Sequence, residues 1–197
     1  MSHQEQRSLF TASEQRALAS WGKPKQQALD LGADSLQAWK AGIAGYQQKI
    51  QRSQPPQQSA LFDIPSKVID AATIDPFDLP LYNFHFFEWP ADRHPDTPCI
   101  YFVIDTCLPL LLYVGETCKA NQRWKGVHDC KQYVLNYQAL HRQQNLPTAV
   151  NTAFWWNTPA QHHHRLSLES ALIKRWRSPF NKENWHFWGT PFVNISK

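Results

Sequence analysis

Two apolar segments, Ile100-Tyr101-Phe102-Val103-Ile104-Asp105 and Leu110-Leu111-Leu112-Tyr113-Val114-Gly115, decide how this chain folds. Both have the length of a strand and are rich in β-branched, aromatic and aliphatic residues. A short turn around Leu108-Pro109 joins them. We therefore expect two buried strands that pair with each other, which would place Tyr101 beside Tyr113.

The segments that follow predict an α+β fold. Ala120–Trp124 and Asp129–Arg142 have the spacing of helices, Ala149–Trp156 is a third apolar strand, and Gln161–Trp176 is a further helix. The order strand, strand, helix, helix, strand, helix is typical of a small domain with a three-stranded sheet flanked by helices. We assign this domain to residues 98–197.

The first half of the chain predicts a mainly helical and irregular region. Thr11-Ala12-Ser13-Glu14 has the form of a capping box, and a second helix is expected to start at Asp34 or Ser35. We expect a helical region over residues 1–60 that ends in a Gln- and Pro-rich linker. Residues 61–97 are expected to form an irregular segment that wraps the core.

The charge is unevenly distributed over the 197 residues. Residues 1–98 have 9 Lys and Arg against 11 Asp and Glu, whereas residues 99–197 have 11 against 5. A basic second half indicates a polyanionic partner such as nucleic acid.

The cysteines and the longest apolar stretch indicate the cellular compartment in which this protein is expected. Cys99 and Cys107 lie in apolar, strand-like surroundings, which predicts buried free thiols and a reducing cytosol. The N-terminus has no apolar signal core, and the stretch Leu108–Val114 is too short to span a bilayer. We expect a soluble cytoplasmic protein without membrane contact.

The two strand segments carry a pair of triplets that is continued further along the chain. Cys99-Ile100-Tyr101 and Tyr113-Val114-Gly115 are followed, at fitting spacing, by Arg123, by Glu169 within a helix, and by Asn181 behind a proline. This series spans about residues 98–184 and resembles the GIY-YIG nuclease family. The first triplet departs from the family in having Cys for Gly, an exchange between small residues that the fold tolerates.

The resemblance implies an endonuclease that hydrolyses phosphodiester bonds with Mg²⁺ or Mn²⁺. Glu169 would be the sole carboxylate ligand of the ion, which suits a hard cation that keeps several waters. Arg123 would hold the scissile phosphate and stabilise the charge of the transition state. Tyr101 and Tyr113 would position or deprotonate water, and Asn181 would hydrogen-bond backbone and brace the site.

The identity of the general base stays open between Tyr113 and His128. A phenol with a pKa near 10 is a poor base at neutral pH, although a nearby metal or arginine would lower that pKa. His128 has the better intrinsic pKa. Glu116, directly after the glycine, is either a second acidic partner of the metal or a residue at the end of a strand.

Basic residues around the motif predict contacts with the DNA backbone. His162-His163-His164 are consecutive on a helix and point in different directions, so a shared metal site is not expected. We interpret them as a helix start that faces solvent or phosphate. The residues expected to bind DNA are Lys119, Arg123, Lys125, His164, Arg165 and Lys174.

Two peptides in the first half predict a docking function. Gln6-Arg7-Ser8-Leu9-Phe10 resembles the peptide with which bacterial repair and replication proteins bind the sliding clamp, and Gln58-Ser59-Ala60-Leu61-Phe62 repeats its Gln-x-x-Leu-Phe outline. The alternative is that both are ordinary hydrophobic anchors at helix ends. The residues expected to bind the clamp are Gln6, Leu9, Phe10, Gln58, Leu61 and Phe62.

Together these features favour a metal-dependent DNA endonuclease of the bacterial cytosol. Its expected substrates are branched, nicked, mismatched or damaged DNA in repair or recombination, and the sliding clamp would recruit it. Two alternatives stay open: a GIY-YIG relic that binds nucleic acid without cutting it, and an adaptor whose main property is clamp docking.

Overall fold

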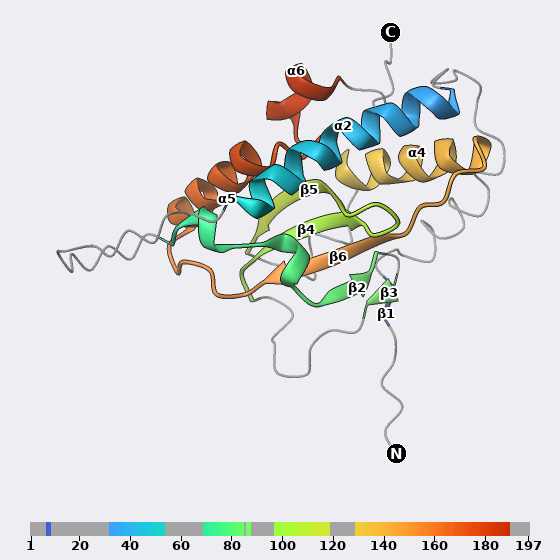
Figure 1. Ribbon diagram of the computed structural model, residues 1–197. Helices are drawn as coiled ribbons and strands as arrows, with labels where there is room; N and C mark the ends of the chain where they lie inside the picture. Colours follow the sequence, from blue (N-terminus) through green and yellow to red (C-terminus); the bar gives the residue numbers. More distant parts are fainter. Residues whose placement is uncertain are drawn as a thin grey trace, which may run out of the picture.

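The structure is a computed structural model that describes residues 7–8, 32–53, 69–84, 86–87, 97–118 and 129–189. The fold is α+β, as predicted, with a four-stranded antiparallel sheet in the order β2-β6-β4-β5 (Figure 1). These strands are β2 (Leu81–Asn83), β6 (Val150–Trp155), β4 (Cys99–Asp105) and β5 (Leu110–Thr117).

The predicted hairpin is present and lies inside the sheet. β4 pairs with β5 on one side and with β6 on the other, so that Tyr101 is opposite both Gly115 and Phe154. Every residue of β4 is buried, which explains why its sequence is apolar up to Ile104. The register with β5 shifts between Val103 and Ile104, a β-bulge that bends the hairpin and increases its twist.

The prediction of a three-stranded sheet is wrong by one strand. β2 pairs antiparallel with β6, although it lies within the segment expected to be irregular. A second, two-stranded sheet joins β1 (Arg7–Ser8) to β3 (Phe86–Phe87). β2 spans only three residues directly after Pro80, too few for an alternating pattern to mark a strand.

The predicted helices that fall on described residues are confirmed. They are α2 (Ala33–Arg52), α4 (Asp129–Gln143) and α5 (His162–Trp176). The helices expected at Thr11 and at Ala120–Trp124 lie outside the described residues. The described residues also form short elements: the 3₁₀ helices η1 (Ala71–Thr73), η2 (Pro76–Asp78) and η3 (Lys182–Asn184), and α6 (Trp185–Trp188).

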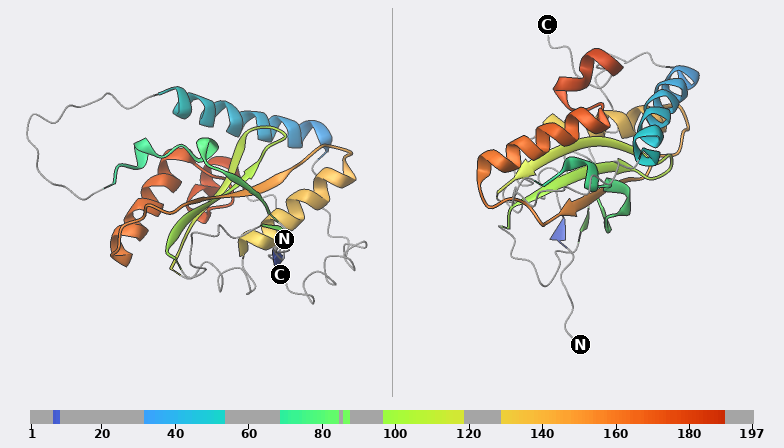
Figure 2. Two further views of the ribbon diagram at one scale, coloured as in Figure 1. Left: turned by 90° about the horizontal axis from the view of Figure 1, so that it is seen from below. Right: turned by 60° about the vertical axis from the view of Figure 1, so that its left-hand side comes forward.

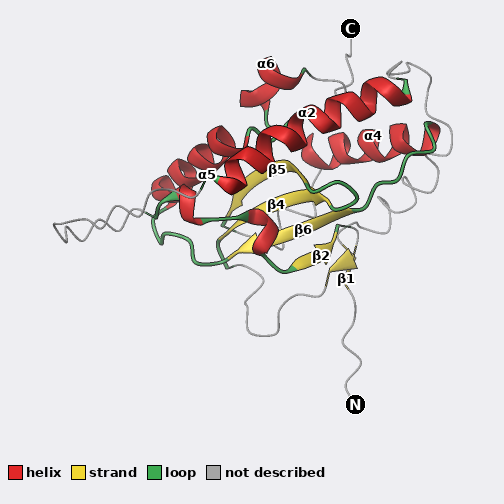
Figure 3. Ribbon diagram, viewed as in Figure 1, coloured by secondary structure: helices red, strands yellow, loops and turns green. Residues whose placement is uncertain are grey.

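The core forms two clusters because alternate residues of β4 face opposite sides of the sheet. Tyr101 and Val103 pack in a cluster with residues of α2 and α4, whereas Phe102 and Ile104 pack in a cluster with residues of α5. Figures 1 and 3 show the long helices gathered on the β5 side of the sheet, opposite β2. The further views in Figure 2 show how strongly the sheet is twisted.

Helix α2 is part of the same core as the second half of the chain. Leu36 and Ile43 are fully buried in the cluster that contains Tyr101. Trp39 Nε1 donates a hydrogen bond to the carbonyl of Trp188, and Tyr46 donates one to the carbonyl of Arg175. Helix α2 is thus packed on the four-stranded sheet.

Strand β5 is an edge strand whose outward polar groups are covered by side chains. Gln47 of α2 accepts from the Leu111 amide at 2.8 Å and donates to the Leu111 carbonyl at 2.9 Å. Asn181 bonds Val114 in the same way, at 2.9 Å in both directions. Two carboxamides therefore replace part of a neighbouring strand, which leaves these edge groups satisfied.

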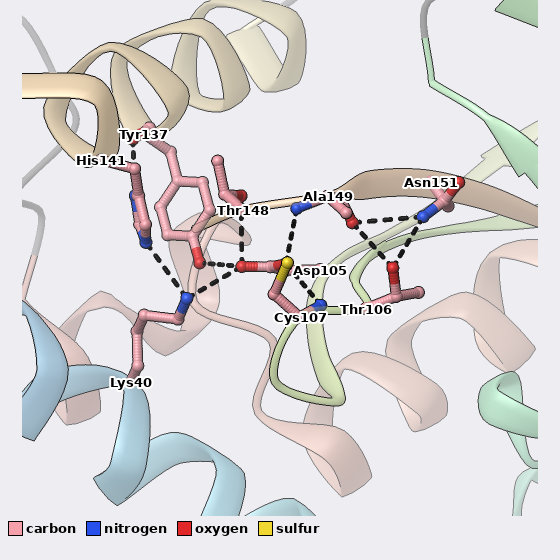
Figure 4. Close-up of polar contacts among 9 residues, drawn as sticks. All are labelled: Lys40, Asp105, Thr106, Cys107, Tyr137, His141, Thr148, Ala149 and Asn151. Atoms are coloured by element: carbon pink, nitrogen blue, oxygen red, sulfur yellow. Dashed lines mark hydrogen bonds and ion pairs between the residues drawn. The ribbon is translucent and has the colours of Figure 1, made fainter. Parts of the chain in front are cut away.

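A buried polar cluster of Lys40, Asp105, Tyr137 and His141 joins α2, β4 and α4 (Figure 4). Asp105 is fully buried, and its carboxylate accepts from Lys40 Nζ at 2.9 Å and from the Tyr137 hydroxyl at 2.6 Å. Thr148 Oγ1 and the amides of Cys107 and Ala149 also donate to it. We call this the Asp105 cluster.

The thiols are free in the described part of the chain, but the prediction of their burial holds for only one of the two. Cys99 is buried. Its burial raises the pKa of the thiol, and the negative charge of Glu116 raises it further. Cys107 is exposed because it lies in the turn between β4 and β5 and not in either strand. None of the helices described is long and apolar enough to cross a membrane.

Candidate functional site

The two triplets meet where β4 and β5 pair. The Tyr101 ring lies directly over Gly115, so that a Cβ at position 115 would overlap Cζ and the hydroxyl oxygen of Tyr101. The rings of Tyr101 and Tyr113 lie side by side, as predicted, with centroids 5.8 Å apart and planes at 31°. Tyr101 is 1% exposed, whereas Tyr113 is only partly buried. Of the two phenols, Tyr113 is the one that a ligand can reach.

A cavity of about 390 Å³ lies between β5, α4, α5 and η3. It brings together three of the predicted site residues: Tyr113 from β5, Glu169 from α5, and Asn181 from the turn after α5. Tyr113 lies far from Glu169 and Asn181 in sequence, so their common cavity is a property of the fold. We call it the Tyr113–Glu169 cavity. Its lining also includes Asp129, Tyr133, Lys182 and Glu183.

Glu169 is held in place by strand β5. Its Oε1 accepts a hydrogen bond from the backbone amide of Glu116 at 2.8 Å. The side chain is partly buried and lies between the buried Leu168 and the exposed Ser170 on α5. A carboxylate with one oxygen fixed by an amide has a defined plane, which suits a group that has to bind a cation in one geometry.

Asn181 makes the backbone hydrogen bonds that were predicted for it. In addition to its bonds with Val114, its Oδ1 accepts from the Ser178 hydroxyl at 2.6 Å. Next to it, the Phe180 amide donates to the carbonyl of Leu112 at 2.9 Å. Asn181 is buried and fixes the turn after α5 to β5, so the geometry gives it a bracing role.

The expectation that Arg165 faces DNA needs correction. Its side chain is 5% exposed, and Nε donates to Glu116 Oε1 at 2.7 Å. Nη1 donates to the carbonyls of Pro159 and Ala160 at 3.0 and 2.8 Å. Arginine is usually exposed, and nothing in the local sequence indicates a buried partner on the distant strand β5. The same contact occupies the Glu116 carboxylate, so Glu116 is paired within the protein.

The other predicted DNA contacts divide into two groups. His164 and Lys174 are exposed on α5, as a DNA contact requires, and stay predictions. Lys119, Arg123, Lys125 and His128 lie outside the described residues, so the choice of base between Tyr113 and His128 also stays open.

The predicted clamp-binding residues stay predictions as well. All six lie outside the described residues, which include only Arg7 and Ser8 of the first peptide. These two residues form β1 and pair with Phe87 and Phe86. The clamp-binding residues outside the described ranges are Gln6, Leu9, Phe10, Gln58, Leu61 and Phe62.

The sequence interpretation missed the charged rim of the cavity. Lys182 Nζ and Asp129 Oδ2 are 2.8 Å apart, and both side chains are largely exposed. The hydrogen bond to Asp129 raises the pKa of Lys182. Burial, followed by the charge of Asp129, raises the pKa of Tyr133 on the cavity wall. The only available signal was position: Lys182 follows Asn181, and Asp129 starts a predicted helix.

The described residues of the cavity cannot by themselves complete the coordination of a hard divalent cation. Within the described ranges, His, Cys, Asp and Glu nowhere form a group of three that could hold a metal. Glu169 still offers a carboxylate oxygen of the type that Mg²⁺ and Mn²⁺ prefer, and Mg²⁺ typically uses one or two carboxylates with waters and phosphate oxygens. The donor chemistry thus fits an ion completed by water and substrate.

Comparison with known proteins gives no match: neither protein-family models, nor curated proteins, nor solved structures show a significant similarity to this chain.

Proposed function

We propose that this protein is a metal-dependent endonuclease that hydrolyses phosphodiester bonds in DNA. The observation that carries the proposal is the convergence of Tyr113, Glu169 and Asn181 on one cavity. These are residues of the series that resembles the GIY-YIG family, and they come from three separate elements. The charge of the second half supports a polyanionic substrate.

Each residue of the proposed site would have a separate role in the reaction. Glu169 would hold Mg²⁺ or Mn²⁺, and the bound ion would supply Lewis-acid stabilisation of the phosphate. Tyr113, or His128, would take the proton of the attacking water. Arg123 would bind the scissile phosphate with a bidentate guanidinium.

The supporting residues would keep this geometry fixed. Asn181 holds β5 and the turn after α5 together, so it maintains the distance between Tyr113 and the end of α5. Lys182 lies at the cavity rim, where an ammonium group attracts a phosphate backbone. Because Lys182 is paired with Asp129, its contact with DNA would replace one ion pair by another.

A single site of this kind nicks one strand. Branched, nicked, mismatched or damaged DNA is the substrate class that we propose, in the context of repair or recombination. Recruitment by the bacterial sliding clamp is the proposed role of the two Gln-x-x-Leu-Phe peptides.

The test compares the wild-type protein with Glu169→Gln on labelled single strands, duplexes, flaps and junctions, with Mg²⁺ or Mn²⁺. Gln keeps an oxygen for the Glu116 amide, so the fold is expected to persist while the charged ligand is lost. We expect cleavage by the wild type and a loss of at least about 100-fold in Glu169→Gln, the usual range for loss of transition-state charge stabilisation.

Asp78→Asn is the matched control, because it removes an exposed carboxylate in η2, away from the cavity. It is expected to cut like the wild type. Equal cleavage by the wild type and Glu169→Gln would refute the proposal. So would salt-sensitive DNA binding by the wild type without cleavage under either metal, which is the behaviour of a non-catalytic binding module.

A further inference from the structure

Helix α5 contacts Glu116 at two points that lie one helical turn apart. Glu169 accepts from the Glu116 backbone amide at 2.8 Å, and Arg165 donates to the Glu116 carboxylate at 2.7 Å. Residues 165 and 169 have the i, i+4 spacing that places side chains on the same helix face. Helix α5 therefore contacts both the backbone and the side chain of Glu116.

The Arg165 guanidinium is itself immobilised. Nη1 donates to the carbonyls of Pro159 and Ala160, directly before α5. The side chains of Arg165 and Glu116 are 5% and 8% exposed. His162 also approaches the Glu116 carboxylate, with Nε2 3.7 Å from Oε2, but its ring is 61% exposed. The buried partner of Glu116 is therefore Arg165.

The Arg165–Glu116 ion pair is not expected to contribute much to the stability of the fold. A buried salt bridge often contributes no more than well-packed apolar residues of the same volume, because both charges lose their hydration. What Arg165 and Glu116 do fix is the position of the Glu116 amide relative to Glu169. The Glu116 backbone amide is the group that hydrogen-bonds Glu169, and the loss of such a contact to a metal ligand typically reduces metal affinity about 10–100-fold.

We propose that Arg165 and Glu116 are positioning residues that orient the Glu169 carboxylate for metal binding, an inference that rests on the proposed function of Glu169. Without Arg165, the buried Glu116 carboxylate is left without its ionic partner and has to turn toward water. That movement displaces the amide that fixes Glu169 Oε1. The role of Arg165 is thus to set the metal affinity of the site and not to contact DNA.

The experiment measures metal affinity separately from DNA binding. The variants are Arg165→Met, which keeps an unbranched side chain without the charge, Arg165→Lys, which keeps the charge without the fork, and Glu116→Gln. For each, Mn²⁺ binding is measured by calorimetry without DNA, and the half-saturating Mn²⁺ concentration, kcat and KM for DNA are measured in the cleavage assay. Arg142→Met is the control, since Arg142 is an exposed arginine at the end of α4.

We expect Arg165→Met to raise the half-saturating Mn²⁺ concentration by about 10–100-fold. At saturating Mn²⁺, KM for DNA should stay within about two-fold of the wild type and most of kcat should return. Arg165→Lys is expected to recover part of the affinity, because the positive charge is kept while the guanidinium that bonds Glu116 and the carbonyls of Pro159 and Ala160 together is lost. Arg142→Met should behave as the wild type in every measurement.

The possible outcomes separate the inference from the proposed function. A wild type that cuts DNA, together with an unchanged Mn²⁺ affinity in Arg165→Lys and Glu116→Gln, overturns the inference and leaves the function intact. An increase in KM for DNA without a change in Mn²⁺ affinity also overturns it. If Arg165→Met does not fold, the other two variants decide. A wild type that neither cuts DNA nor binds Mn²⁺ contradicts the proposed function itself.

Discussion

At the scale of single residues, Gly115 is constrained by space. The Tyr101 ring occupies the volume that a Cβ at position 115 would need, and Tyr101 is buried on all sides. Gly115→Ala is therefore expected to lower the free energy of unfolding by about 1–3 kcal/mol, the usual cost of overpacking a core. Urea denaturation followed by tryptophan fluorescence measures this change.

Gly42→Ala provides the matched control for that prediction. Gly42 lies in α2, and an added Cβ there would meet nothing within 4 Å. The same substitution is expected to raise the free energy of unfolding by up to about 1 kcal/mol, because alanine favours the helix. A Gly115→Ala variant as stable as the wild type would mean that Tyr101 can move away from the strand.

Three of the predicted site residues line the cavity, whereas the burial of Arg165 was not expected. Tyr113, Glu169 and Asn181 follow a family-like series, so their spacing carried the information. The burial of Arg165 was not predictable, because its partner Glu116 is 49 residues away and lies on another element. Cys107 was misjudged for a related reason: apolar neighbours do not distinguish a strand from the turn that ends it.

At the scale of elements, the Asp105 cluster joins α2 to the sheet. Lys40→Met is expected to lower the free energy of unfolding by about 3–5 kcal/mol, because it leaves the buried Asp105 carboxylate without its counter-charge. Lys49→Met on the same helix removes an exposed lysine and should change the free energy of unfolding by less than about 0.5 kcal/mol. Equal effects of the two substitutions in urea denaturation would show that the pair does not hold α2.

The elements themselves were predictable in proportion to their length. α2, α4 and α5 each repeat an apolar face over several turns, and β4 and β5 are long apolar runs. β2 was missed because three residues carry too little periodicity. Its pairing with β6 is decided by contacts between segments about 70 residues apart, as in Tyr82 opposite Thr152.

At the scale of the whole molecule, the same cluster predicts how stability depends on pH. Burial, followed by the charge of Lys40, lowers the pKa of His141 below its usual value of 6.5. His141 Nδ1 donates to the Tyr137 carbonyl and Nε2 accepts from Lys40, an arrangement that requires the neutral ring. As pH falls through about 6.5, the unfolded chain binds a proton that the folded chain does not, so stability falls.

Asp105 acts in the same direction at lower pH. Burial alone would raise its pKa, but hydrogen bonds from Tyr137, Ala149 and Lys40 outweigh burial and lower it. Its contribution to stability is therefore present above the pKa of the unfolded chain, about 3.8, and is lost as pH falls below that value.

The measurement is thermal unfolding from pH 8 to pH 5. We expect the melting temperature of the wild type to fall toward pH 5. In His141→Gln, the slope of melting temperature against pH should be smaller, because glutamine does not titrate. His163→Gln removes an exposed histidine of α5 and is expected to keep the wild-type slope. A His141→Gln variant with an unchanged slope would assign the pH dependence to other groups.

The covered edge of β5 has a consequence for how two copies of this protein can associate. Gln47, Asn181 and Glu169 occupy the outward backbone groups of this strand, so a second chain cannot extend the sheet there by adding a strand. This fold therefore cannot form a symmetric dimer in which the β5 edges of two copies pair. For the proposed nuclease, cutting both strands of a duplex would therefore require two separate binding events, or a dimer formed through other surfaces.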